Sequence, residues 1–272
     1  MTTELVRPQP DHSGPDAGEV LTLNDLAVHF GGIKAVDGIT LGLARGRISG
    51  ILGPNGSGKS TLLGAITRLT PLTQGTLRFE ERDYSRVRPE AVARLGIGRT
   101  FQTVRLLEDL TVRENVQLGH DLIAGARPWW SRPGKADRET ADAAVATALE
   151  RTGLAGKEAL RPGQLSYGLQ RRVEIARAIV MSPKLLLLDE PTAGMNRFER
   201  EEIGELMADL RAEGLTQLIV EHDVQMMVDV CDHLFAMNSG RLIASGTPSD
   251  VVRDPAVREA YLGKQDNDDR DS

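Results

Sequence analysis

One short segment of the sequence has residues of the right types and spacing to bind phosphate groups. Residues 53–60 match the pattern G-x-x-x-x-G-K-[ST]. Glycines let backbone N–H groups turn toward phosphate oxygens, and a helix that begins near the lysine directs its positive end at the same place. In this pattern the lysine reaches the β- and γ-phosphates, and the last hydroxyl ligates Mg²⁺. The segment predicts a site for ATP and Mg²⁺ formed by Gly53, Pro54, Asn55, Gly56, Ser57, Gly58, Lys59, Ser60 and Thr61.

A second candidate group follows a run of four leucines. Residues 185–188 predict a buried strand, and Asp189 and Glu190 come directly after it. In a parallel sheet the two acids would reach the carboxyl edge, where ligands of such sheets bind. Asp189 can then hold Mg²⁺ through its water shell, and Glu190 can polarise the water that attacks the γ-phosphate. A solvated strand end is the alternative, which the phosphate-binding segment makes the weaker of the two.

The elements that must position these residues are visible as short apolar runs that alternate with helical patterns. One helical face repeats apolar residues over 203–210, and Gly214 is placed to end that helix. Strands that alternate with helices predict an α/β fold with a mostly parallel sheet and helices on both faces. The expected strands are residues 21–30, 33–43, 48–52, 76–79, 185–188, 218–220 and 234–237.

Residues 90–180 have a different pattern, with few strand-like runs and several helical ones. Apolar residues at 141, 145, 148 and 149 share one helical face. This part predicts a helical insertion between the phosphate-binding segment and the acidic strand end. Within it, a loop broken by proline and glycine carries Trp129 and Trp130, which could form a contact surface or pack on the insertion's helices. Residues 1–19 and 264–272 predict a flexible tail and an acidic tail.

Composition excludes several classes of protein. The net charge is −6 and no long run of Lys and Arg occurs, so no nucleic-acid partner is expected. The longest apolar runs are far shorter than the roughly 20 residues of a membrane span, and the N-terminus has no apolar signal core. The single cysteine, Cys231, suits a reducing compartment. A cytoplasmic protein that could still dock on a membrane protein is therefore expected.

Five further segments, in a particular order, narrow the prediction. They are Phe30, Gln102 within residues 99–103, the stretch Leu-Ser-Tyr-Gly-Leu-Gln at 165–170, Ala-Gly-Met-Asn at 193–196, and His222 within residues 221–223. Their set and order closely resemble the ATP-binding cassette of ABC transporters over about residues 20–263. The resemblance implies a P-loop NTPase fold with a RecA-like, mostly parallel core sheet and an N-terminal antiparallel β-subdomain. It also implies a helical subdomain at roughly 103–180 and a C-terminal family extension at roughly 246–263.

The resemblance implies roles for three of these residues within one chain. Phe30 would stack on adenine, and Gln102 would sense Mg²⁺ and water and link the site to a membrane partner. His222 would contact the γ-phosphate and help to orient Glu190. Taken alone, each has a plainer interpretation: Phe30 as a core residue, Gln102 as a surface amide, and His222 as a surface histidine at a strand end.

Two residues of the signature stretch would act across a subunit boundary. Ser166 and Gly168 would contact the γ-phosphate of ATP bound to the opposite subunit, and Ser166 also stands where a helix N-cap is expected. Tyr167 and Leu169 depart from the usual Leu-Ser-Gly-Gly-Gln, and Leu169 lacks the amide. Asn196, expected at the contact between subunits, stands where many members carry Asp.

The strongest resemblance is to the ATPases of branched-chain amino acid importers. It rests on residues 99–102, 165–168 and 221–223 and on the stretch from 246 to 263. The implied partners are integral permease subunits, a second cassette that is identical or a related chain, and, indirectly, a periplasmic-type solute-binding protein. The chain would lie on the inner face of the cell membrane. Alternatives are ATPases of amide or urea uptake or of lipopolysaccharide export, a soluble non-transport ABC ATPase, and a non-hydrolysing regulatory module.

Overall fold

The fold of the chain is given by a computed structural model that describes residues 18–124 and 134–262. A six-stranded sheet forms its centre, in the order β10-β9-β3-β8-β7-β6. All neighbours are parallel except β9 and β10. The predicted α/β class with a mostly parallel core sheet is therefore confirmed. The strands are β3 Ile48–Leu52, β6 Ile97–Arg99, β7 Leu185–Asp189, β8 Thr216–Val220, β9 His233–Asn238 and β10 Arg241–Gly246.

A second, antiparallel sheet is formed mainly by the N-terminal part of the chain, in the order β2-β1-β4-β5. A turn at Gly31, where φ is +58°, joins its two long strands, as the sequence predicts. The first strand begins at Glu19, the last residue of the predicted flexible tail. The strands are β1 Glu19–Phe30, β2 Ile33–Ala44, β4 Gln74–Phe79 and β5 Arg82–Asp83.

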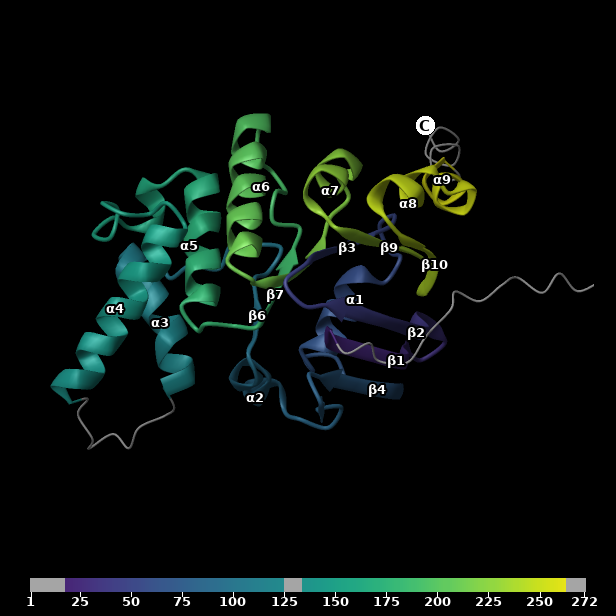
Figure 1. The fold of residues 1–272 in the computed structure, drawn as a ribbon, viewed down its shortest axis with the longest axis horizontal. Helices are drawn as coiled ribbons and strands as arrows, with labels where there is room; N and C mark the ends of the chain where they lie inside the picture. The colour runs from purple at the N-terminus through teal and green to yellow at the C-terminus, as the bar shows by residue number, and fades with distance from the viewer. Residues whose placement is uncertain (1–17, 125–133, 263–272) are drawn as a thin grey trace, which may run out of the picture.

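Alternate residues of the central strands enter two separate hydrophobic cores. In β7, Leu186 and Leu188 pack with helices α5 Tyr167–Ile179, α6 Arg197–Ala212 and α7 Val224–Val230. The intervening leucines, Leu185 and Leu187, pack on the other face with α1 Lys59–Ile66 and the antiparallel sheet. Figure 1 shows this layering, with α5, α6 and α7 on one side of the central strands and α1 between the two sheets. All four leucines are fully buried, and burying one leucine side chain contributes about 1.5–3 kcal/mol.

The segment between β6 and β7 is helical, as its sequence pattern indicates. Its main helices are α3 Val112–Ala124, α4 Lys135–Arg151 and α5, and they stand together at one end of the molecule (Figure 1). The predicted apolar face of α4, from Ala141 to Leu149, is buried. Trp129 and Trp130 lie outside the described residues, as do residues 1–17 and 263–272.

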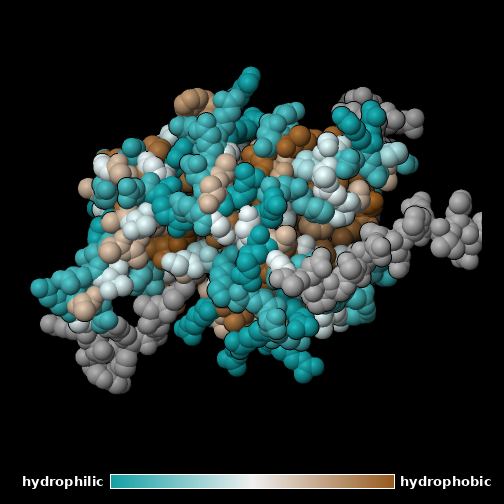
Figure 2. Space-filling view, viewed as in Figure 1, coloured by the Kyte–Doolittle hydropathy of each residue, from teal (hydrophilic) through white to brown (hydrophobic). Residues whose placement is uncertain are grey.

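Short elements complete the structure. Helix α2 Pro89–Val92 and a 3₁₀ turn precede β6, and α8 Pro248–Arg253 and α9 Pro255–Leu262 follow β10. Val251 and Val257 anchor these last helices in the core. On the face drawn in Figure 2, hydrophobic side chains gather between the C-terminal helices and the antiparallel sheet, where β9 and β10 end the central sheet. Neither β6 nor β10 is among the strands expected from the sequence.

Candidate functional site

The phosphate-binding segment is the turn between β3 and α1. Gly56 and Gly58 adopt left-handed backbone angles, with φ of +79° and +102°. A Cβ at Gly58 would lie 2.1 Å from the carbonyl oxygen of Ala35, and one at Gly53 would lie 2.3 Å from that of Met237. Close packing against two neighbouring segments therefore requires glycine at both positions, and it fixes the turn rigidly.

Positive charge is concentrated inside this turn. Lys59, the first residue of α1, is 6% exposed, and its ammonium donates to the carbonyl oxygens of Gly53 at 2.7 Å and Pro54 at 3.0 Å. The N-terminal end of α1 adds the partial positive charge of its unpaired N–H groups. The hydroxyl of Ser57 is buried and has no hydrogen-bond partner among the described residues. Together, these positive and hydrogen-bonding groups suit an anion with several oxygens, such as the triphosphate of a nucleotide.

The two acids of the second candidate group lie at the end of β7. Strand β8 pairs with both β3 and β7 in parallel, so the phosphate-binding turn and the acids share one edge of the sheet. The Oδ2 atom of Asp189 accepts a hydrogen bond from Arg99 at 3.0 Å, while its Oδ1 atom is buried and has no partner within residues 18–124 and 134–262. An unpartnered carboxylate oxygen is suited to a hydrated cation.

Glu190 has an unusual backbone. Its φ is +45°, which costs of order 1–3 kcal/mol for a residue other than glycine. A backbone hydrogen bond to the carbonyl of Val220, at 2.8 Å, helps to hold this conformation. Its side-chain Oε2 accepts a hydrogen bond from the Gln102 amide at 2.8 Å. The structure thus brings these two predicted site residues into direct contact.

Two arginines that the sequence pattern does not indicate bind groups next to this contact. Arg99 binds Asp189. Arg171 of α5 is fully buried and donates to the carbonyls of Phe101 at 2.6 Å and Gln102 at 2.7 Å. Its charge is balanced by Glu174 at 2.7 Å. Desolvation by burial, the largest influence on Glu174, raises the pKa of this carboxyl, and its hydrogen-bonded neighbours act in the opposite direction.

The signature residues serve the start of α5 within this chain. The hydroxyl of Ser166 accepts a hydrogen bond from the N–H of Leu169 at 3.3 Å, which makes Ser166 the N-cap, as expected. Gly168 is buried, and a Cβ there would approach Glu199 at 3.3 Å. No hydrogen bond between described residues joins Ser166 or Gly168 to the phosphate-binding turn. Their contact with the nucleotide of a second subunit, which the resemblance implies, stays a prediction.

The remaining predicted residues lie at element ends. Phe30 closes β1 and is 52% exposed, so its ring is accessible to a stacking partner and the core interpretation is wrong. His222 follows β8, and its half-exposed ring lies 3.6 Å from the carboxylate of Glu221. Asn196 caps α6 by accepting from the N–H of Glu199 at 3.0 Å, and the Glu199 carboxylate in turn accepts from the N–H of Asn196.

The donor set fits Mg²⁺ held jointly with a nucleotide. In the described ranges no cluster of three or more His, Cys, Asp or Glu side chains could hold a metal by itself. Mg²⁺ in such sites keeps several waters and takes one or two protein oxygens together with phosphate oxygens. The Ser60 hydroxyl, on an exposed residue, and the Oδ1 atom of Asp189 would be these two protein oxygens.

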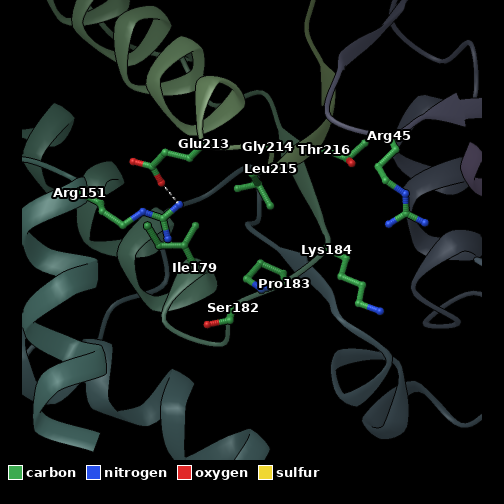
Figure 3. A pocket seen from close by; sticks show the side chains of 10 residues that line it. All are labelled: Arg45, Arg151, Ile179, Ser182, Pro183, Lys184, Glu213, Gly214, Leu215 and Thr216. Atoms are coloured by element: carbon green, nitrogen blue, oxygen red, sulfur yellow. Dashed lines mark ion pairs between the residues drawn. The ribbon is translucent and has the colours of Figure 1, made fainter. Parts of the chain in front are cut away.

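A pocket at the opposite edge of the sheet is a poor alternative. Figure 3 shows Arg151 and Glu213 facing each other as an ion pair on one side, with Arg45 and Lys184 on the other. The last two both pair with Glu80, at 3.2 and 2.7 Å. Each of these three cations already has a carboxylate partner, so a phosphate would have to displace one.

A phosphate-binding turn, a following helix and an acidic strand end at one edge of a parallel sheet define a P-loop ATPase. The ABC transporter family matches residues 36–193, and the branched-chain amino acid ATP-binding cassette transporter family matches residues 241–267. The chain belongs to the ABC transporter family, as an ATP-binding and ATP-hydrolysing subunit.

Curated relatives and solved structures agree with this assignment. The high-affinity branched-chain amino acid transport ATP-binding proteins LivG of Salmonella typhimurium and of Escherichia coli K12 are each 39% identical, over 90% of this chain and 98% of theirs. The ADP conformation of MJ1267, an ATP-binding cassette of an ABC transporter, superposes with a TM-score of 0.80 at 34% identity, covering 90% and 99% of the two chains.

Members of this class act with membrane permease subunits and pair with a second cassette. A dimeric cassette, MJ0796 bound to ADP and Pi, is 26% identical to this chain, covers 84% of it, and superposes with a TM-score of 0.69. None of the helices described here combines the length and the apolar composition needed to span a bilayer.

Proposed function

We propose that this subunit hydrolyses ATP to energise uptake of branched-chain or related amino acids through separate permease subunits. The observation that supports the ATPase part is the sheet edge that Asp189 and Glu190 share with the phosphate-binding turn. The similarity to LivG proteins over 90% of the chain supports the class of solute. The match of residues 241–267 to the branched-chain family supports it independently.

Within one chain, the proposed division of labour follows the geometry. Residues 53–61 bind the phosphates, with Lys59 as the main cation. Ser60 and Asp189 hold Mg²⁺, with Gln102 nearby, and the metal would neutralise charge on the phosphates. Glu190 takes a proton from the attacking water. Gln102 keeps the Glu190 carboxylate oriented through the 2.8 Å hydrogen bond.

Three other residues complete the proposed site. Phe30 stacks on adenine. Its exposed ring lies at the end of β1, which pairs with the start of β2. Strand β2 in turn packs against the phosphate-binding turn at Ala35. His222 follows β8, the strand between β3 and β7, and contacts the γ-phosphate. In the closed dimer, Ser166 and Gly168 of one subunit contact the nucleotide of the other. Asn196 lies at the subunit contact.

Closure of the dimer would move the membrane partner through the helical insertion. The insertion carries Leu107, Leu118 and Leu122, which are 37–64% exposed, and such apolar side chains suit a protein contact. The subunit would then lie on the inner face of the membrane, with the solute-binding protein on the far side. ATP drives the cycle because it has higher affinity for the closed state.

The solute is tested by isolating the transporter from membranes with a tagged copy of this chain. Mass spectrometry should find two permeases and a second cassette, identical or related. After reconstitution in vesicles, ATP hydrolysis should rise with a binding protein loaded with leucine, isoleucine or valine. Stimulation only by an amide or urea, or co-purification of lipid-transport bridge components, would contradict amino-acid uptake while leaving the ATPase assignment intact.

A further inference from the structure

Arg99 occupies an unexpected place beside Asp189. It is the last residue of β6, and its guanidinium donates to Asp189 Oδ2 at 3.0 Å and to the hydroxyl of Thr67 at 2.9 Å. The guanidinium carbon also lies 5.1 Å from the centre of the Phe101 ring. The Arg99 and Asp189 side chains are only 12% and 5% exposed. The arginine is therefore held in place by three different groups.

This contact gives Asp189 a permanent cation on one oxygen and leaves the other oxygen for a metal. A buried carboxylate without a partner is costly, so Arg99 stabilises the metal-free protein. Two cations that share one carboxylate repel each other, and the repulsion is stronger in a site of low dielectric constant. Arg99 and a metal at Asp189 therefore oppose each other, even though they bind different oxygens.

We propose that Arg99 is the resident counter-ion of Asp189 and weakens the binding of Mg²⁺, so that the metal leaves readily with ADP. The proposal rests on the role of Asp189 in metal binding proposed above. A counter-ion role and a purely orienting role for Arg99 predict opposite effects on metal binding. If Arg99 only oriented the carboxylate, removing it would weaken metal binding, whereas a resident counter-ion predicts that removing it strengthens binding.

The test uses the purified full chain with ADP and Mn²⁺ as the probe for the metal, followed by the electron paramagnetic resonance of free Mn²⁺. For Arg99→Gln we expect Mn²⁺ to bind at least about fivefold more tightly, the lower end of typical coupling between sites. The metal-free variant should melt at a lower temperature than wild type, and Mn²⁺ with ADP should restore part of the loss. Unchanged or weaker Mn²⁺ binding would overturn the proposal.

Three matched variants make the result specific. Arg105→Gln removes an exposed arginine that lies 4.8 Å from the same Phe101 ring, and its Mn²⁺ affinity should stay at the wild-type level. Arg99→Lys keeps the charge but lacks the planar fork of N–H groups that holds Asp189 and Thr67 in a fixed geometry, so it should also resemble wild type. Weaker binding there would indicate an orienting role and overturn the proposal, even if Arg99→Gln failed to fold.

The third variant, Asp189→Asn, separates the counter-ion proposal from the proposed metal site on which it rests. Asp189→Asn removes the carboxylate charge and should abolish Mn²⁺ binding above the level of ADP alone. Unchanged Mn²⁺ binding in Asp189→Asn would show that Asp189 does not hold the metal, and the proposed metal site would then fail. A large loss in Asp189→Asn with no gain in Arg99→Gln would remove only the counter-ion role of Arg99.

Discussion

The amide of Gln102 donates a hydrogen bond to the carboxylate of Glu190, with 2.8 Å between Nε2 and Oε2. The carbonyl of Gln102 is in turn held by Arg171 of α5 at 2.7 Å. The helix that begins within the signature stretch, the loop after β6 and the proposed general base are therefore connected through two hydrogen bonds. A displacement of α5 relative to the central sheet would change the position of Glu190.

The first prediction concerns this link. Gln102→Ala should lower ATP turnover by about tenfold, because a hydrogen bond to a charged group contributes about 1.5 kcal/mol and about 1.4 kcal/mol in the barrier is tenfold in rate. Binding of a fluorescent ATP analogue should be little changed. Gln117→Ala, which removes an amide bonded to Asp121 on α3, is the control. A large loss of nucleotide binding in Gln102→Ala would contradict an orienting role.

The second prediction concerns the buried Arg171. Arg171→Met should lower the free energy of unfolding by about 3 kcal/mol, because it removes the closer ion-pair partner of the buried Glu174 carboxylate and leaves only Arg177, at 3.5 Å. Urea denaturation measures the change. The double variant Arg171→Met with Glu174→Leu should recover part of the loss, since the buried carboxylate is gone and the remaining cation, Arg177, is partly exposed. A double variant as unstable as the sum of the two single changes would contradict this explanation.

The third prediction compares two glycines of the phosphate-binding turn. Both have positive φ, but a Cβ at Gly58 would meet the carbonyl oxygen of Ala35 at 2.1 Å, whereas one at Gly56 would meet nothing within 4 Å. Gly58→Ala should therefore destabilise the protein more than Gly56→Ala, whose cost is the left-handed strain of about 1–2 kcal/mol. Thermal unfolding without nucleotide makes the comparison. Equal losses would show that packing against β2 does not fix the turn.

The fourth prediction concerns Asn196. Asn196→Ala should cost about 1 kcal/mol, because it removes an N-cap whose side chain accepts from the N–H of Glu199. Asn196→Asp should retain the cap and lose nothing, since a carboxylate is favoured at a helix N-terminus. Urea denaturation of the isolated chain measures both. A clear loss in Asn196→Asp would mean that the cap requires the neutral amide.

Much of the fold could be predicted because its signals are local. The unbroken apolar run from Leu185 to Leu188 and the glycine pattern of residues 53–60 each lie within a few residues of sequence. Strand β6 has only three residues and follows a 3₁₀ turn, so no periodicity identifies it. It is ordered by its pairing with β7, which is about 90 residues away.

The site likewise combines residues that the local sequence indicates with residues that only tertiary contacts reveal. The residue types at Lys59, Asp189 and Glu190 indicate their chemistry directly. Arg99 and Arg171 do not, because an arginine in a sequence is normally expected on the surface. Both are buried through partners that only the tertiary structure brings near them: Asp189 for Arg99, and the carbonyls of Phe101 and Gln102 for Arg171.

The role of Glu190 as general base is tested most directly by steady-state phosphate release from Glu190→Gln. We expect turnover to fall by at least about 100-fold, the lower end for loss of a general base, while ATP binding persists. Glu205→Gln, an exposed glutamate on α6, should hydrolyse ATP like wild type. Unchanged turnover in Glu190→Gln would contradict the assignment of the base at the end of β7.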